Sequence, residues 1–139
     1  MTTQEFVQEQ VAIVGKQVQA VFRNMPADKW DEQATPQSMS SRDTLHHLAE
    51  CCQAFLTSAE GGEHDWGSWS VEDTSSDNLM KVYVDLRDKC IAKVGESEDP
   101  GIMKLAGDFL SIHEAYHVGQ MVTLRLMIGG DFDPYSIYS

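Results

Sequence analysis

The stretch FLSIHEAYH, residues 109–117, has the residue spacing of a helix and carries the most informative pair of side chains in the chain. His113 and His117 lie four residues apart, so they project from the same face of a helix. On a helical wheel with about 3.6 residues per turn, that face also carries Phe109, Leu110, Tyr116, Leu124 and Met127. Both imidazoles are therefore expected to point inward. Because an imidazole buried without a partner is unfavourable and the neutral ring is a common metal ligand, the pair favours a metal site.

The same letters also fit the helix of zinc metalloproteases, His-Glu-x-x-His, in which the glutamate acts as general base. The rest of the sequence argues against a protease. No glutamate follows Glu114 to act as a third ligand, and no histidine follows His117. Gly119 comes one residue too early for the extended metzincin motif. Little of the chain before the motif is typical of a β-strand that could hold an extended peptide.

The charge balance excludes several classes of partner. The chain has 22 acidic and 10 basic residues, a formal net charge of −12, whereas binding to nucleic acid needs a basic surface. Anionic membrane surfaces are disfavoured for the same reason. No charged-then-apolar leader opens the chain, and no apolar run approaches the about 18 residues of a membrane span. Three cysteines do not make a disulfide framework, so we expect a cytoplasmic protein.

Two segments in the first half of the chain show the apolar spacing of amphipathic helices. The first ends before Pro26, and its seam is Val7, Val11, Val14, Val18, Val21 and Met25. The second follows Ser40, whose spacing to Asp43 resembles a capping box, and it ends at Gly61-Gly62. Its stripe is Leu45, Leu48, Ala49, Cys52, Phe55 and Leu56.

The second half contains a loop and two more helices. The polar segment from Glu63 to Ser76 is predicted to be a long loop, and loops of that length are often functional. A third helix ends near Gly95 and carries Leu79, Tyr83, Leu86, Cys90 and Val94. After a turn at residues 99–101, a fourth helix runs from about Ala106 to Ile128. Strand patterns are scarce, so the sequence predicts an all-α four-helix bundle that forms one domain, residues 1–139.

Two histidines on one helix do not complete a catalytic metal site, which needs a third protein ligand and an open position. The remaining candidates are His46, His47 and His64. Helical geometry does not choose between His46 and His47, because both lie off the centre of the second helix's stripe. Glu50 lies one turn beyond His46 and suits a surface pair with it, and His64 in the loop is expected to be solvated.

The run SSRDTLHHLAE, residues 40–50, resembles the second helix of the DinB/YfiT-like family of four-helix-bundle metalloproteins. In that family a serine at the helix start is followed, seven residues on, by a ligating histidine and then Leu-Ala, which places the ligand at His47. The run from His113 through His117 to Gly119-Gln120 resembles the family's final-helix motif, which supplies two further ligands. The tail from Gly129-Gly130 to Tyr135 is also similar, so the resemblance covers nearly the whole chain.

This resemblance implies a metal site of His47, His113 and His117 for nickel or zinc, commonly in a homodimer. Some relatives are transferases or isomerases that use a low-molecular-weight thiol such as bacillithiol or mycothiol. The chain is therefore expected to be a thiol-dependent S-transferase that acts on a small electrophile. The alternatives are a metal-dependent hydrolase that uses metal-bound water and a non-catalytic metal-binding stress-response protein. Substrate specificity would lie in residues 63–95.

Several further residues have alternative interpretations. Gln120 lies on the expected inward face and either donates a hydrogen bond that orients a ligand or packs in the helix. Cys51, four residues after His47, either reaches the cavity or is an inert filler. Glu114 is expected on the flank of its helix, facing Arg125. Two loop tryptophans line a pocket mouth or anchor the loop, namely Trp66 and Trp69.

Overall fold

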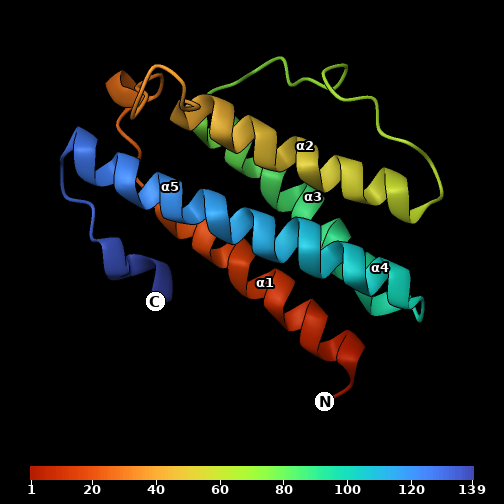
Figure 1. Ribbon diagram of the computed structural model, residues 1–139. Helices are drawn as coiled ribbons and strands as arrows, with labels where there is room; N and C mark the ends of the chain where they lie inside the picture. The colour runs from red at the N-terminus through yellow and green to blue at the C-terminus, as the bar shows by residue number, and fades with distance from the viewer.

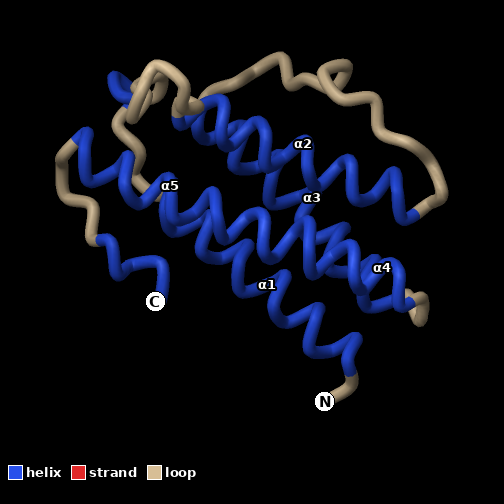
Figure 2. The backbone as a smooth tube through the Cα atoms, viewed as in Figure 1, coloured by secondary structure: helices blue, strands red, loops and turns tan.

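The computed structural model describes all residues 1–139, and its regular elements are helices without strands (Figures 1 and 2). The long helices are α1 (Thr3–Phe22), α2 (Ser41–Ala59), α3 (Ser76–Glu96) and α5 (His113–Ile128). The short helix α4 (Pro100–Leu105) continues through a π-helical segment (Ala106–Ile112) into α5, so the three form one rod. Short 3-10 turns lie at Ala27–Lys29 and Pro134–Tyr138. The predicted four-helix bundle is confirmed.

The fourth long helix begins earlier than the sequence pattern indicated. We predicted a turn at residues 99–101 and a start near Ala106, but the helix starts at Pro100. The side chain of Asp99 accepts a hydrogen bond from the backbone N–H of Gly101, 2.9 Å away. Asp at the N-cap followed by Pro in the first turn is a strong start signal, because Pro has no N–H to leave unpaired there.

The start of α2 follows the predicted cap. The hydroxyl of Ser40 accepts a hydrogen bond from the backbone N–H of Asp43 at 3.1 Å, and Ser40 is almost fully buried. No return bond from Asp43 to Ser40 completes a capping box. This cap fixes where α2 begins and therefore the direction in which its histidines point.

Apolar seams of the long helices form one core. α1 packs against α3 and α5, and α2 packs against α3 and against the π-helical segment and α5. Val11, Val14, Val18 and Val21 of the predicted seam are buried, whereas its two ends, Val7 and Met25, are half-buried. Each such side chain contributes about 1.5–3 kcal/mol when fully buried. The residues that bury completely or nearly so include Val11, Val18, Val21, Leu45, Leu48, Phe55, Leu79, Tyr83, Leu110 and Leu124.

The loop of residues 60–75 crosses the length of α2 on its outer side before α3 begins (Figure 2). Because of this crossover, α2 and α3 run in the same direction, while α1 and α5 run in the opposite one (Figure 1). The loop therefore lies over the end of α2 that carries the candidate histidines. None of the helices combines the length and the apolar composition that crossing a membrane requires.

Candidate metal centre

Three histidines from two helices converge in the bundle. The Nε2 atoms of His47 and His113 are 3.3 Å apart, and those of His113 and His117 are 3.1 Å apart. One ligand atom from each of the three lies within 4.8 Å of the others, so the cluster could hold a metal ion. The structure thus brings together the residues predicted as ligands, while their binding of a metal stays a prediction.

The spacing of the nitrogens suits a small dication. With metal–nitrogen distances of about 2.0–2.1 Å in a tetrahedral site, neighbouring ligand nitrogens lie about 3.3 Å apart. The two Nε2 separations of 3.3 and 3.1 Å agree with that geometry. Three imidazoles on one side of the ion would leave a position open for another ligand.

Burial keeps these imidazoles neutral. It lowers the pKa of His47 and His113, and for His47 the neighbouring His113 ring adds to the effect. Burial, together with His113 and His47, lowers the pKa of His117 to about 4. Metal binding requires a neutral ring with a free lone pair. The cluster is therefore in its ligating form at neutral pH without having to lose protons.

The Nδ1 atoms of His117 and His113 differ in their hydrogen bonding. Nδ1 of His117 lies 2.9 Å from Oε1 of Gln120, and Nε2 of Gln120 donates to the Tyr116 hydroxyl at 2.9 Å. As an amide oxygen can only accept, Nδ1 of His117 carries the proton and Nε2 presents its lone pair to the cluster. Gln120 thus orients the ring of His117, but it does so as an acceptor from an exposed position and not as the inward-facing donor that we predicted. Nδ1 of His113 is buried without a hydrogen-bond partner.

Aromatic side chains cover the cluster from the loop and the π-helical segment. The ring of Phe109 stacks on His113 with a centroid separation of 5.4 Å and an interplanar angle of 15°. The ring of Trp66 lies 6.4 Å from that of His47 and 6.1 Å from that of Phe109. Trp66 is therefore placed at the mouth of the cluster, whereas Trp69 packs on His46 at 5.1 Å.

Cys51 reaches the cluster. Its Sγ lies 3.6 Å from Nε2 of His47, and the residue is fully buried. Burial raises the pKa of the Cys51 thiol to about 12, with Glu114 and Glu50 adding to the effect. Without a metal the sulfur is therefore a neutral thiol.

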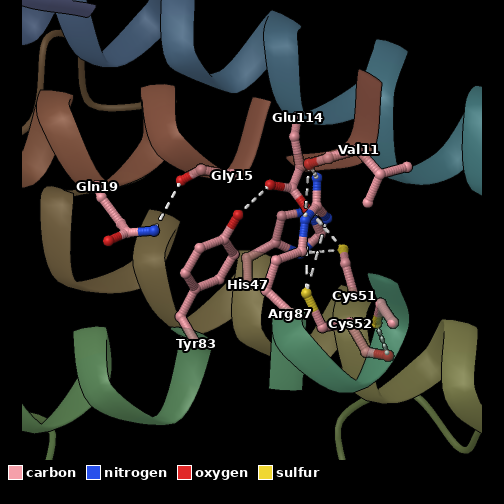
Figure 3. A network of polar contacts seen from close by, with 10 residues as sticks. Val11, Gly15, Gln19, His47, Cys51, Cys52, Tyr83, Arg87 and Glu114 are labelled. Atoms are coloured by element: carbon pink, nitrogen blue, oxygen red, sulfur yellow. Dashed lines mark hydrogen bonds and ion pairs between the residues drawn. The ribbon is translucent and has the colours of Figure 1, made fainter. Parts of the chain in front are cut away.

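Glu114 is not on the flank of its helix, as the sequence led us to expect, but fully buried. Its carboxylate pairs with Arg87 and accepts a hydrogen bond of 2.6 Å from the Tyr83 hydroxyl (Figure 3). Burial raises the pKa of Glu114, although Arg87 and Tyr83 act against this. Arg125, the predicted partner, instead donates to the backbone carbonyl of Val21 at 2.7 Å. Because Glu114 is held in this network, it is not available as a protease-type base.

The helical wheel therefore placed the centre of the buried face of α5 one residue too early in the sequence. Its buried residues are Glu114, His117, Val118, Met121, Leu124 and Arg125, and His113 lies at the edge of this face. Tyr116 and Met127, which the wheel placed inward, are 61% and 60% exposed. The signal that we missed is Arg87, which lies between Tyr83 and Cys90 on the buried stripe of α3 and provides the charge that Glu114 needs.

His64 is not solvated, contrary to our expectation. Its Nε2 donates to Oε2 of Glu50 at 2.8 Å, and both side chains are about nine-tenths buried. The same carboxylate oxygen accepts from the backbone N–H of Gly67 at 3.3 Å. Glu50 thus binds the loop through His64 and Gly67 and does not pair with His46. The predicted pair of His46 with Glu50 is wrong.

Comparison with known proteins agrees with this architecture. The family model described as "DinB family" matches residues 1–100, which include α1, α2, the loop and α3. No curated protein and no solved structure matches the chain. The match includes His47 but ends before His113 and His117, so the case for those two residues rests on their geometry. With an all-helical bundle and a family match over most of its length, the chain belongs to the DinB family.

Proposed function

We propose that the protein is a metal-dependent enzyme that uses a low-molecular-weight thiol to attack a small electrophile. The observation that carries this proposal is the convergence of three neutral imidazoles, His47, His113 and His117, without a carboxylate among them. A divalent ion, nickel or zinc, would keep its full charge there and lower the pKa of a thiol or a water molecule toward neutrality.

The residues around the cluster favour attack by a thiol over attack by water. A hydrolase benefits from a base that takes the proton of water, and the two nearby carboxylates are already engaged. Glu114 is bound to Arg87 and Tyr83, and Glu50 is bound to His64. A thiol, with an ordinary pKa of about 8.5, loses its proton far more readily than water does. Thiol attack therefore needs no base from the protein, and hydrolysis is the second choice.

Other residues support this role because they orient the imidazoles and limit the access of water to the cluster. Gln120 fixes the ring of His117, and the cap at Ser40 fixes the register of His47. Trp66 and Phe109 shield the side of the cluster that faces the loop. A bound substrate would be in contact with these rings rather than with bulk water.

A non-catalytic metal-binding protein of the stress response is the other candidate. The observation in its favour is the same lack of a free acid or base at the imidazole nitrogens. Such a protein would bind metal with no turnover, and this outcome distinguishes the two candidates.

The test combines metal analysis with an activity assay. Protein purified without an affinity tag should contain close to one nickel or zinc per chain by elemental analysis, and chelation should lower its melting temperature by mass action. The metal-loaded protein should then speed the consumption of monobromobimane by bacillithiol or mycothiol above the uncatalysed rate. Lack of metal would contradict the whole proposal, whereas metal without turnover would favour the non-catalytic candidate.

We also propose a homodimer in the cytoplasm. A row of exposed apolar side chains along the π-helical segment and α5 supports the dimer, comprising Ile112, Tyr116, Leu126 and Met127. Closed two-fold dimers are the commonest way to cover such a surface. The three free cysteines are consistent with a reducing compartment. Light scattering at micromolar concentration should give twice the chain mass of 15.5 kDa, and a monomer would contradict the dimer.

A further inference from the structure

The winding of the rod changes directly before His113. In an α-helix each backbone N–H donates to the carbonyl four residues back, and in a π-helical turn to the carbonyl five residues back. The N–H of His113 donates to the carbonyls of Asp108 and Leu110, at the end of the π-helical segment (Ala106–Ile112). It therefore passes over the carbonyl of Phe109, which an α-helix would pair with it.

No other backbone N–H is in position to take this carbonyl. The π-helical segment ends at Ile112, and the α-helical winding of α5 begins at His113. With that winding the next N–H, that of Glu114, donates to the carbonyl of Leu110. The change from π to α winding thus leaves the oxygen of Phe109 free to accept a hydrogen bond from a side chain.

One ring nitrogen of His113 needs such an acceptor. Nε2 is the atom that faces the cluster, 3.3 Å from Nε2 of His47 and 3.1 Å from Nε2 of His117. A neutral ring that presents the lone pair of Nε2 carries its proton on Nδ1. Nδ1 of His113 is buried without a hydrogen-bond partner, and a buried donor without an acceptor is unfavourable.

The free carbonyl and this nitrogen are neighbours. Phe109 precedes His113 by four residues, and the side chain of a helical residue leans back over the turn before it. The two rings stack with their centroids 5.4 Å apart and an angle of 15° between their planes. Burial lowers the pKa of His113, and the backbone carbonyl of Phe109 acts against this as an acceptor close to the ring. The hydroxyl of Ser111 is also buried without a partner, but it lies two residues away and on a different face of the helix.

We propose that Phe109 is a positioning residue of the metal centre, because its carbonyl oxygen accepts the Nδ1 proton of His113 and thereby holds Nε2 toward the cluster. Gln120 does the same for His117 through its side chain. The two histidines of α5 are thus oriented by different groups, one by an exposed amide and one by the backbone that the π-helical segment frees. This inference rests on the proposed function for the metal that Nε2 binds, whereas the hydrogen bond itself needs no metal.

Selective isotope labels test the hydrogen bond directly. Protein with ¹⁵N-labelled histidine and ¹³C-carbonyl-labelled phenylalanine is observed by NMR, both metal-free and loaded with zinc, and the ring signals of His113 are identified with His113→Gln. In both states His113 should carry its proton on Nδ1, and Nδ1 should show a scalar coupling to one phenylalanine carbonyl. The coupling should vanish in Phe109→Leu, where that carbonyl is no longer labelled. A proton on Nε2 of His113 in the metal-free protein, or no coupling in the zinc-loaded protein, would overturn the proposal.

Weakening the carbonyl as an acceptor tests its effect on metal binding. The hydroxy-acid analogue of leucine at position 110 turns the amide after Phe109 into an ester, whose carbonyl is a weaker acceptor. Zinc affinity, measured by calorimetric titration, should fall roughly tenfold, the low end of the loss caused by removing such a partner. The same replacement at the exposed Leu126 of α5 is the matched control and should leave the affinity unchanged. Equal losses at both positions, or an unchanged affinity for the ester at position 110, would contradict the role of the carbonyl.

Phe109→Leu separates the carbonyl from the ring. This variant keeps the backbone oxygen and removes the ring that stacks on His113, so its zinc affinity should stay close to that of the wild type. A loss as large as that of the ester would show that the ring positions His113, and the carbonyl would then have no such role.

The hydrogen bond and the proposed function can fail separately. The coupling at Nδ1 of His113 in a protein that takes up no nickel or zinc would support the hydrogen bond and refute the enzyme. Metal-dependent turnover by a protein without that coupling would refute the hydrogen bond and leave the proposed function in place.

Discussion

Oε1 of Gln120 lies 2.9 Å from Nδ1 of His117, and this one contact determines which ring nitrogen of His117 faces the other two histidines. Gln120 lies one turn beyond His117 on α5 and is itself exposed. The orientation of a buried imidazole is thus controlled from the surface of the bundle.

Replacing Gln120 should therefore weaken metal binding without unfolding the protein. In Gln120→Leu the proton of His117 loses its acceptor, and loss of such a partner costs about 10- to 100-fold in metal affinity. Gln120→Glu keeps an acceptor and should retain the affinity. Calorimetric titration with zinc measures both variants, and Thr123→Ala on the same exposed side of α5 serves as the control. An unchanged affinity in Gln120→Leu would show that the contact does not orient the ligand.

The adjacent histidines of α2 should differ sharply. His47→Ala would leave two imidazoles, too few for a tightly held dication at a three-ligand site. His46 packs on Trp69 and takes no part in the cluster, so His46→Ala should keep the metal. Metal per chain after identical purification measures the difference. Loss of metal in His46→Ala alone would refute our assignment of ligands.

The buried pair of Arg87 and Glu114 should matter for stability far more than a surface pair. Arg87→Met leaves the carboxylate of Glu114 buried with two neutral donors, the Tyr83 hydroxyl and the Cys52 thiol, which should cost about 3–5 kcal/mol. Adding Glu114→Gln removes the uncompensated charge and should recover part of the loss. Urea unfolding measures these free energies.

The matched control for that pair is Lys93→Met, whose partner Glu60 is largely exposed. Exposed pairs contribute about 0–1 kcal/mol, so this variant should be close to wild type. Equal losses in the free energy of unfolding for Lys93→Met and Arg87→Met would mean that burial does not increase the contribution of an ion pair to stability.

Acid should destabilise the metal-free protein through His117. Its pKa is about 4 in the folded chain against an ordinary value of 6.5, so between these values the unfolded chain binds the extra proton. The free energy of unfolding therefore falls as the pH is lowered from about 6.5 to about 4, and this contribution is fully present above that range. The effect should be on the order of 2 kcal/mol, since partial access of solvent reduces the full shift.

His117→Gln isolates this contribution from those of the carboxylates. Urea unfolding of the wild type and the variant at a series of pH values gives the difference in stability at each pH. That difference should shift in favour of the variant on acidification, and a constant difference would exclude His117 as its origin.

The sequence was sufficient for the fold because each long helix has a regular apolar seam and a recognisable start or stop. The family resemblance also placed His47 rather than His46 in the cluster, which periodicity could not do because it put both at an edge; ligation by His47 stays a prediction. The sequence was not sufficient for Glu114 or His64, because their burial depends on partners in other segments, Arg87 on α3 and Glu50 on α2. Local spacing in one helix does not contain that information.

The π-helical segment at Ala106–Ile112 has a further consequence for how such a site changes in evolution. A π-helical turn contains one residue more than an α-helical turn. Deleting one residue between Phe109 and His113 would restore ordinary winding and rotate the upstream part of the rod, including Phe109, relative to α5 by about 100°. Phe109 would then leave its place above His113, while the two histidines of α5 would keep their mutual spacing. A single-codon deletion could thus remove the ring that covers the histidine cluster and leave the spacing of His113 and His117 intact.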